Sequence, residues 1–474
     1  MDRSTRRLRN KKLCLGVTLS ALTCGSIAHA EIPLTDPEKT SGWEVTIGGR
    51  EDAYLSWVFG HTVDSALVGN VVPFQDPSAA SADRYTLVGP QIGIQGNPTP
   101  AGAVASPTTD TNVSTPRIRG GFASSVLTFN VRKQILPEMK LTIQQSLWAG
   151  IQNGLTGGVR PYNAPASVDW REQWLQLEGS WGMVWGGRRA GLYNRGGMKM
   201  DWYLMHRQGV GHPCDVDSNA AATCGQTGTG SMFPARQAQI GYATPDVSGF
   251  QLNVAIADPA MIDTSWNRTP LPRFEAEATF HRNFTGTDEL NIWANGLSQV
   301  IGRTAEVAPN PQTGEPGIPA DATKQVYGVG GGAWGRFSGF GLGGTGWAGA
   351  GLGTAWAFGN TAIDDEGTLR NHFGYLIIGN YRVGGFEVAG SYGSANVKET
   401  DWDKGPSLCP DSACEMKFGR KVSVIKQVSG IGGKVAYHID PVVFSVDFML
   451  LDYKWWRGEE QKANVVSAGL LSEF

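Results

Sequence analysis

Apolar and polar residues alternate along most of this chain, in runs of about ten residues separated by turn residues. In residues 44–59, Ala53, Leu55, Trp57 and Phe59 stand two positions apart. A period of two places successive side chains on opposite faces of a strand. The run therefore predicts a β-strand with one apolar face, and similar patterns predict strands at residues 117–131 and 139–151.

The segments between the predicted strands are alternately short and long. The short turns lie at 136–138, 179–182, 245–249, 283–287, 335–339, 383–385 and 438–441. The long segments lie at 60–115, 152–168, 191–235, 258–270, 302–321, 359–368 and 397–419, and a last connection lies at 456–460. About 16 antiparallel strands fit between them, and an even number with short turns at one end is typical of bacterial outer-membrane β-barrels.

Composition is consistent with this interpretation, although a soluble propeller would share it. The chain has 64 glycines, 16 tryptophans and 12 tyrosines among 474 residues, which suits twisted strands, tight turns and aromatic girdles. The glycine-dense segment 328–353 also carries regularly spaced Trp334, Phe340, Leu342 and Trp347. We therefore expect it to form closely packed strands and not a flexible linker.

The first thirty residues have the pattern of a secretory signal peptide. Basic residues precede an apolar stretch, and Ala28-His29-Ala30 forms a small-x-small cleavage site before Glu31. The expected division is a signal peptide at 1–30 and one barrel domain at 31–474. Removing residues 1–30 changes the formal charge from −3 to −8, which argues against nucleic acid as a partner. The rest holds no apolar run near the ~20 residues of a membrane helix, so the chain is either soluble or spans a membrane as strands.

Four cysteines remain after residue 30, and they fall into two close pairs. Cys214 precedes Cys224, and Cys409 precedes Cys414, each pair within a polar segment. In an exported chain this even count favours local disulfides over a metal site. We expect no metal and no cofactor. Gly341–Gly346 fits GxGxxG, but no helix or βαβ unit follows it, so enzymatic motifs are lacking and we expect no enzyme.

The stretch from Trp170 to Tyr242 shows the organisation of the chain most clearly. LEGSWGMVWGGRR predicts a strand, a tight turn and a second strand, and a long polar excursion from 191 to 235 precedes IGYATPDVSGFQL. With the terminal Phe474, these motifs resemble the trimeric general porins of Gram-negative outer membranes. The resemblance implies a transmembrane antiparallel barrel, a homotrimer in outer-membrane lipid, passive diffusion of small hydrophilic solutes and ions, and a segment 191–235 folded inward to constrict the pore.

The same resemblance implies which residues line the constriction. Arg119, Arg171, Arg188 and Arg236 stand at positions similar to the wall arginines of the family, and Asp201 stands at the position of a loop acid. The second family acid is replaced by Met205, which His206 and Arg207 follow. Charges on opposite walls discriminate between ions in a pore. Because basic residues replace the second acid, we expect a preference for anions.

Three alternatives stay open at this level. One is a substrate-selective outer-membrane channel, for example for phosphate, sulfate or dicarboxylates, with Trp202 and Tyr203 as an apolar contact surface. Another is a secreted all-β binding protein or hydrolase such as a propeller, although no repeat of ~40 to 50 residues is visible. The last is an adhesive or purely structural barrel that conducts nothing.

Overall fold

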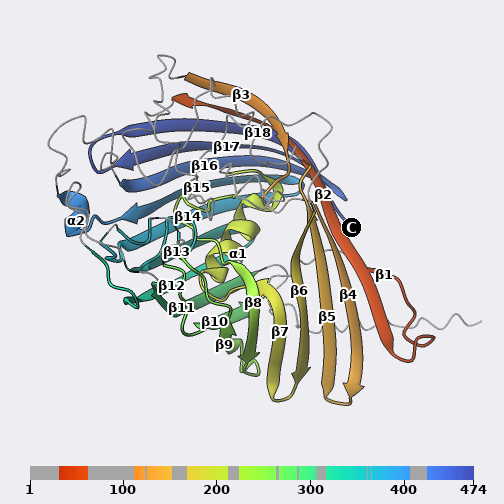
Figure 1. Cartoon of the computed structure of the whole chain (residues 1–474). Helices are drawn as coiled ribbons and strands as arrows, with labels where there is room; N and C mark the ends of the chain where they lie inside the picture. Colours follow the sequence, from red (N-terminus) through yellow and green to blue (C-terminus); the bar gives the residue numbers. More distant parts are fainter. Residues whose placement is uncertain are drawn as a thin grey trace, which may run out of the picture.

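The chain forms one closed antiparallel β-barrel (Figure 1). The computed structural model describes residues 31–61, 112–122, 125–151, 168–211, 224–262, 266–284, 288–304, 306, 317–359, 361–364, 366–405 and 424–474. The predicted signal peptide at 1–30 lies outside these residues and stays a prediction.

The described elements comprise eighteen strands and three short helical segments. In chain order they are β1 (Ile32–Pro33), β2 (Trp43–His61), β3 (Asn112–Arg119), β4 (Ser125–Leu136), β5 (Met139–Ala149), β6 (Val168–Gly179), β7 (Gly182–Ala190), α1 (Arg195–Leu204), η1 (His206–Gln208), β8 (Arg236–Ala243), β9 (Phe250–Ala257), β10 (Arg273–Asn283), β11 (Glu289–Gly302), β12 (Thr323–Phe337), β13 (Phe340–Ala350), β14 (Asn371–Val383), β15 (Phe386–Val397), α2 (Asp401–Lys404), β16 (Ile425–Ile439), β17 (Val442–Trp455) and β18 (Glu460–Glu473).

The barrel wall itself has the predicted sixteen strands. β1 is a two-residue addition to β2, and β3 and β4 pair with the two halves of β2 and so count as one interrupted wall strand. Each other strand pairs with its sequence neighbour, and β18 pairs with β2 to close the ring. The alternation of short turns and long segments defines a short-turn end and a long-loop end of the barrel, as the sequence predicts.

The predicted strand 117–131 is interrupted in the structure. The backbone N–H of Gly121 donates to Asp52 Oδ1 at 2.9 Å, and that of Phe122 donates to Gly209 O at 2.9 Å. A Cβ at Gly121 would meet Asp52, Tyr54 and the Gly209 carbonyl. The wall strand therefore breaks where the chain leaves its β2 neighbour to contact the segment inside the barrel.

The barrel carries an apolar outer surface and a largely polar inner one. Exposed outward residues include Leu175, Ile240, Val254, Ile292 and Ile377. Outward aromatic residues gather near the short turns, among them Trp181, Phe250, Phe284, Phe337, Phe340, Tyr381, Phe386, Tyr437 and Phe444. Such an apolar band bordered by aromatic residues is the surface a bilayer requires of a barrel. Among the described helices, none has the length and apolarity to cross a membrane.

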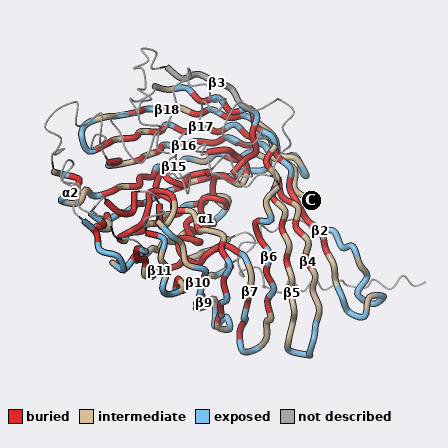
Figure 2. Tube along the Cα trace, viewed as in Figure 1, coloured by how far each residue is buried: buried red, intermediate tan, exposed pale blue. Residues whose placement is uncertain are grey.

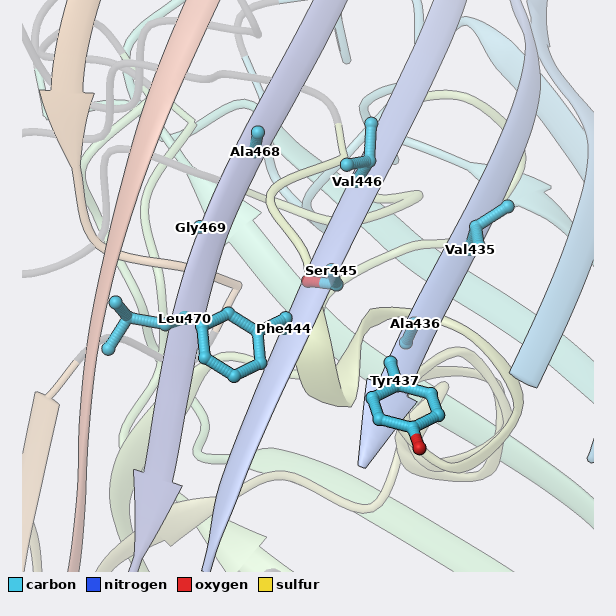
Figure 3. A pocket seen from close by; sticks show the side chains of 9 residues that line it. All are labelled: Val435, Ala436, Tyr437, Phe444, Ser445, Val446, Ala468, Gly469 and Leu470. Atoms are coloured by element: carbon cyan, nitrogen blue, oxygen red, sulfur yellow. The ribbon is translucent and has the colours of Figure 1, made fainter. Parts of the chain in front are cut away.

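A shallow groove on this outer surface lies over β16, β17 and β18 (Figure 3). Val435, Tyr437, Phe444 and Leu470 border it, and the small side chain of the outward Ala468 leaves its floor low. All of its outward side chains are apolar, so the groove continues the lipid-compatible surface.

The C-terminal residue completes the closed ring. Phe474 exchanges backbone hydrogen bonds with Gly49, at 3.0 Å and 2.7 Å. A Cβ at Gly49 would lie 2.7 Å from the Phe474 ring. The terminal aromatic residue thus packs over a glycine of β2 at the junction of the first and last strands.

Candidate functional site

The described parts of the segment 191–235, residues 191–211 and 224–235, fold into the barrel as predicted, and the helix α1 lies inside the ring (Figure 1). The sequence predicts an irregular segment, but residues 195–204 form an α-helix, so that part of the prediction is wrong. Figure 2 shows α1 and the wall beside it as largely buried. Met200 and Leu204 pack with Trp293 and Trp334 in one apolar cluster. This packing stabilises the helix, which contains two poor helix formers, Gly196 and Gly197.

The glycine-rich strands β12 and β13 make room for this helix. A Cβ at Gly343 would lie 2.7 Å from Met200 Sδ, and one at Gly341 would lie 2.9 Å from Leu204 Cδ2. Residues 328–353 therefore form strands, as expected, and their missing side chains let α1 rest against the inner wall.

Hydrogen bonds anchor the inward segment to the wall at two places. At its start, Glu275 of β10 accepts the backbone N–H groups of Leu192 and Tyr193. Further along, Asp447 of β17 accepts those of Val210 and Gly211, at 3.2 Å and 2.9 Å. Buried carboxylates that accept backbone N–H groups make strong, charge-assisted bonds. The segment is therefore fixed on two opposite sides of the barrel.

Asp201 and His206 hold the inward segment together. His206 Nδ1 lies 2.6 Å from Asp201 Oδ1, and Asp201 Oδ2 accepts the Gln226 backbone N–H at 2.8 Å. Asp201 is only 1% exposed and His206 is fully buried. The structure places both predicted constriction residues inside the folded segment, where they bond to one another and not to the wall arginines.

The third loop residue of the predicted set, Arg207, also has a structural partner. Its Nε donates to Glu473 Oε1 of β18 at 3.2 Å. Burial alone would lower the pKa of Arg207, but the ion pair with Glu473 raises it above its usual value. Arg207 therefore ties the inward segment to the last strand.

Two predicted wall arginines, Arg171 and Arg236, lie together on the inner face. Both guanidinium groups stack on Trp148, at 4.8 Å and 4.7 Å from the ring centroid. Arg171 Nε donates to Asp169 at 3.0 Å and Arg236 Nε donates to Glu172 at 3.1 Å. These two arginines of the predicted set therefore lie together at the long-loop end of β6 and β8.

A β-bulge explains how Arg171 and Glu172 both point inward. In the β5–β6 pair, Ser146 faces Glu172 while the next residue, Leu147, faces Trp170. Arg171 is the extra residue, and a bulge locally breaks the strict alternation of faces. Arg171 and Glu172 can therefore both lie on the inner surface, although they are adjacent in the sequence.

The predicted role of Arg188 is corrected by the strand register. On β7 the inward positions include Trp185 and Arg189, whereas Arg188 is exposed on the outer face with Val184. Period-two alternation counted from the buried Trp185 sends residues 187 and 189 inward. Arg189, which the sequence analysis missed, is therefore the inner-wall arginine of this strand.

Arg119 is buried on the inner side but lies apart from the other arginines. It ends β3 opposite Tyr54 of β2, and β5 lies between the interrupted wall strand β3–β4 and β6. The structure thus unites Arg171 and Arg236, sets Arg119 apart, and leaves Arg188 outside the inner surface.

Two further cations of the inward helix were absent from the predicted set. Arg195 Nε donates to Glu277 Oε2 of β10 at 3.0 Å. Burial, followed by the charges of Arg195 and Arg189, lowers the pKa of Lys199 to about 8, and Glu277 partly opposes this. No sequence motif distinguishes these residues from other polar loop positions, because their setting depends on where α1 packs.

The aromatic residues of α1 pack internally. Trp202 lies under the Arg50 guanidinium, 4.7 Å from its ring centroid, and Tyr203 stacks on Trp334 with centroids 5.3 Å apart. Both aromatic side chains are therefore engaged in packing. They therefore do not form the exposed apolar surface expected for a selective channel.

The cysteine and metal expectations can be followed only in part. Cys224 is disulfide-bonded, while Cys214, Cys409 and Cys414 lie outside the described residues, so the two pairings stay predictions. Within the described ranges, no group of three or more His, Cys, Asp or Glu side chains could hold a metal ion.

Comparison with solved structures identifies the fold. The chain is similar to the outer membrane channel DcaP of Acinetobacter baumannii, with a TM-score of 0.56 and 14% identity, over 92% of this chain and 98% of that one. It is also similar to the anion-selective porin from Comamonas acidovorans, with a TM-score of 0.51 and 13% identity, over 91% and 100%. No protein-family model and no curated protein matches the chain. The chain has the fold of the Gram-negative outer-membrane porins.

Proposed function

We propose that this protein is an outer-membrane porin that lets small hydrophilic solutes and ions diffuse passively through its barrel. The observation that carries the proposal is the closed ring of sixteen strands with an apolar outside, a charged inside and one segment folded inward. Only closed barrels and helices satisfy every backbone group in lipid. A polar interior inside an apolar wall is the arrangement that carries water and solutes across a membrane.

The proposed preference is for anions. At the long-loop end of β6–β8 and β10, with the first half of α1, cations outnumber acids by six to four: Arg171, Arg189, Arg195, Lys199, Arg236 and Arg273 against Asp169, Glu172, Glu275 and Glu277. Fixed charges in a confined space select ions of the opposite sign. This excess of positive charge replaces the predicted opposition between the four wall arginines and Asp201.

The proposal includes a homotrimer in the outer membrane and no enzymatic turnover. It is supported by the porin fold, whose similar structures are a channel and a porin. The single closed sheet argues against the soluble propeller, because a propeller would show separate four-stranded blades.

A substrate-selective channel is the second candidate, and the inner aromatic wall favours it. Trp148, Trp174 and Trp185 lie on the inner side beside Arg171, Arg189 and Arg236. Alternating aromatic and cationic groups would suit an anion that carries an apolar body.

Planar-bilayer reconstitution tests both candidates. A general pore gives stable unit conductance, closure in three steps for a trimer, and a reversal potential on the anion side in a KCl gradient. A selective channel gives a current that one solute blocks at low concentration. A purified protein that inserts without conducting would contradict the proposal and would favour a purely structural barrel.

A further inference from the structure

Arg189 is a buried cation without an acceptor. Its side chain is 1% exposed, and its Nε, Nη1 and Nη2 have no hydrogen-bond partner among the described residues. The guanidinium stacks on the rings of Trp174 and Trp185, at 4.7 Å and 4.9 Å from their centroids. This stacking fixes its position and leaves its positive charge uncompensated.

The surroundings of Arg189 are richer in donors than in acceptors. The indole N–H groups of Trp174 and Trp185 are also buried without partners, and on β6 and β8 only Gln176 Oε1 and Gln239 Oε1 are buried acceptors without donors. Buried donors without acceptors carry an energetic penalty that an oxyanion or ordered water relieves. The inner face of β6 and β7 around Arg189 therefore has unpaired hydrogen-bond donors that an anion or water could satisfy.

The nearby acids do not fill this need. Glu275 accepts Leu192, Tyr193, Gln237 and Arg273, whereas Glu277 accepts Arg195. No ion pair with Arg189 exists in the part of the chain that the structure describes. Both carboxylates therefore hydrogen-bond to other groups, and neither forms an ion pair with Arg189.

Lys199 approaches the same region from α1. Its ammonium has no hydrogen bond or ion pair to any described residue, and its side chain is partly exposed. The charged groups that act on it are Arg195 of its own helix, Arg189 of β7 and Glu277 of β10. Lys199 thus stands in a field of net positive charge.

We propose that Lys199 is the contact residue of an oxyanion-binding subsite, with the buried Arg189 as the fixed charge behind it. The inference rests on the proposed function and deepens it, since it makes one loop lysine the residue that selects anions. Lys199 touches the ligand, and Arg189 is a positioning residue that acts through its field. Inorganic phosphate and carboxylates share the required chemistry.

A consequence of this arrangement is a dependence on pH. Because burial and the neighbouring guanidinium groups lower the pKa of Lys199 to about 8, the ammonium is protonated below that pH. The anion preference should be full near pH 6.5 and should decline as the pH rises through 8. The other cations of the subsite are arginines, which stay charged in this range.

The experiment uses the full-length exported protein in planar bilayers, with phosphate and acetate as separate probes. The variants are Lys199→Gln, Lys199→Arg and Arg189→Gln, and Arg188→Gln is the matched control, because it is the adjacent arginine on the outer face. Reversal potentials in a KCl gradient are measured at pH 6.5 and 9.5, together with the reduction of chloride current by each probe. Acetate carries one negative charge at both pH values, whereas phosphate gains a second negative charge as the pH rises. A pH effect seen with acetate therefore comes from the protein and not from the probe.

The wild type should lose anion preference between pH 6.5 and 9.5, and phosphate should reduce its chloride current with saturation. Lys199→Gln should weaken that block about fivefold, the size of a single exposed charge contact, and should remove the pH dependence. Lys199→Arg should keep the preference at both pH values. Arg189→Gln should weaken the block, and Arg188→Gln should match the wild type.

Conducting pores of Lys199→Gln with wild-type selectivity, block and pH response would overturn the subsite while leaving the porin function intact. A wild-type protein without conductance would instead overturn the proposed function. If Arg189→Gln fails to assemble, the two Lys199 variants, on an internal helix, still decide the question. Block by phosphate but not acetate would restrict the ligand to phosphate-type oxyanions.

Discussion

His206 Nδ1 and Asp201 Oδ1 lie 2.6 Å apart inside the segment that folds into the barrel. The same carboxylate accepts the Gln226 N–H, so one acid joins the helical half of the segment to its returning half. Neither residue reaches the wall arginines. The family resemblance predicts that Asp201 faces the wall arginines. In the structure Asp201 instead joins two parts of the inward segment to each other.

Asp201→Asn should loosen the returning half of the inward segment. The substitution removes the charge that strengthens both hydrogen bonds, at a cost of about 1–3 kcal/mol for buried partners. Hydrogen exchange at the Gln226 amide should become roughly 10- to 100-fold faster. Asp246→Asn is the control, because Asp246 accepts the Gly249 N–H in an exposed turn; unchanged exchange at Gln226 in Asp201→Asn would show that the carboxylate anchors nothing.

Gly196→Ala should displace α1 from the wall. A Cβ at Gly196 would lie 2.3 Å from the Trp293 ring, whereas one at Gly197 would meet only the Thr345 side chain at 3.3 Å. Alanine favours helix by about 1 kcal/mol over glycine, but overpacking costs about 1–3 kcal/mol. We expect Gly196→Ala to lower the thermal unfolding midpoint and alter unit conductance, and Gly197→Ala to be neutral or stabilising. Equal behaviour of the two variants would contradict this packing.

Glu172→Gln should shift selectivity further towards anions. Glu172 accepts hydrogen bonds from Arg236 Nε at 3.1 Å and Gln144 Nε2 at 3.1 Å. Removal of its negative charge leaves the positive charges of Arg171 and Arg236 less neutralised. The reversal potential in a KCl gradient should move to the anion side. Glu178→Gln, at the short-turn end of the same strand, should leave it unchanged, and a shift towards cations in Glu172→Gln would refute the proposed field.

The ion pair between Arg370 and Asp403 should open at low pH. Arg370 Nε and Nη2 donate to the two Asp403 oxygens at 2.7 Å each. Burial opposes ionisation, but Arg370 and the Thr400 groups hold the pKa of Asp403 below its usual value. A group with a lowered folded pKa contributes stability above its unfolded pKa and loses it as the pH falls through the folded value.

The protection of the Asp403 and Lys404 amides should therefore persist down to about pH 4 and disappear below it. Asp403→Asn should abolish this dependence and cost about 3–5 kcal/mol locally, because it leaves Arg370 buried without its counter-charge. Protection that is unchanged from pH 6 to pH 2 would contradict the role of the pair. Asp401→Asn, which removes only an exposed partner of Lys404, is the control.

The sequence predicts the barrel well because its information is local. Alternation at residues 44–59 and the turns at 179–182 and 245–249 each specify a strand or a reversal without reference to distant residues. The inner face is harder to predict, because a one-residue shift exchanges the two faces. Arg188 and Arg189 illustrate this, since only the buried position of Trp185 decides between them.

Other features depend on contacts that no local pattern reveals. The bulge at Arg171 sends two neighbouring charges inward, and the break after Arg119 forms where Gly121 and Phe122 meet Asp52 and Gly209. The helix α1 has two poor helix formers, Gly196 and Gly197, in its first turn. It forms because Gly341 and Gly343 of the wall leave space for it. Lys199 gains its setting only from that placement.

The hydroxyls of Ser467 and Ser56 meet across the β18–β2 junction at 3.1 Å, although 411 residues separate them in the chain. No part of the ring can be complete until the final strand has left the ribosome and crossed to its destination. Every edge and every outward apolar side chain must therefore stay protected from aggregation for the whole of synthesis and transit. We therefore expect production of this protein to require a chaperone that keeps the chain unfolded until β18 can pair with β2.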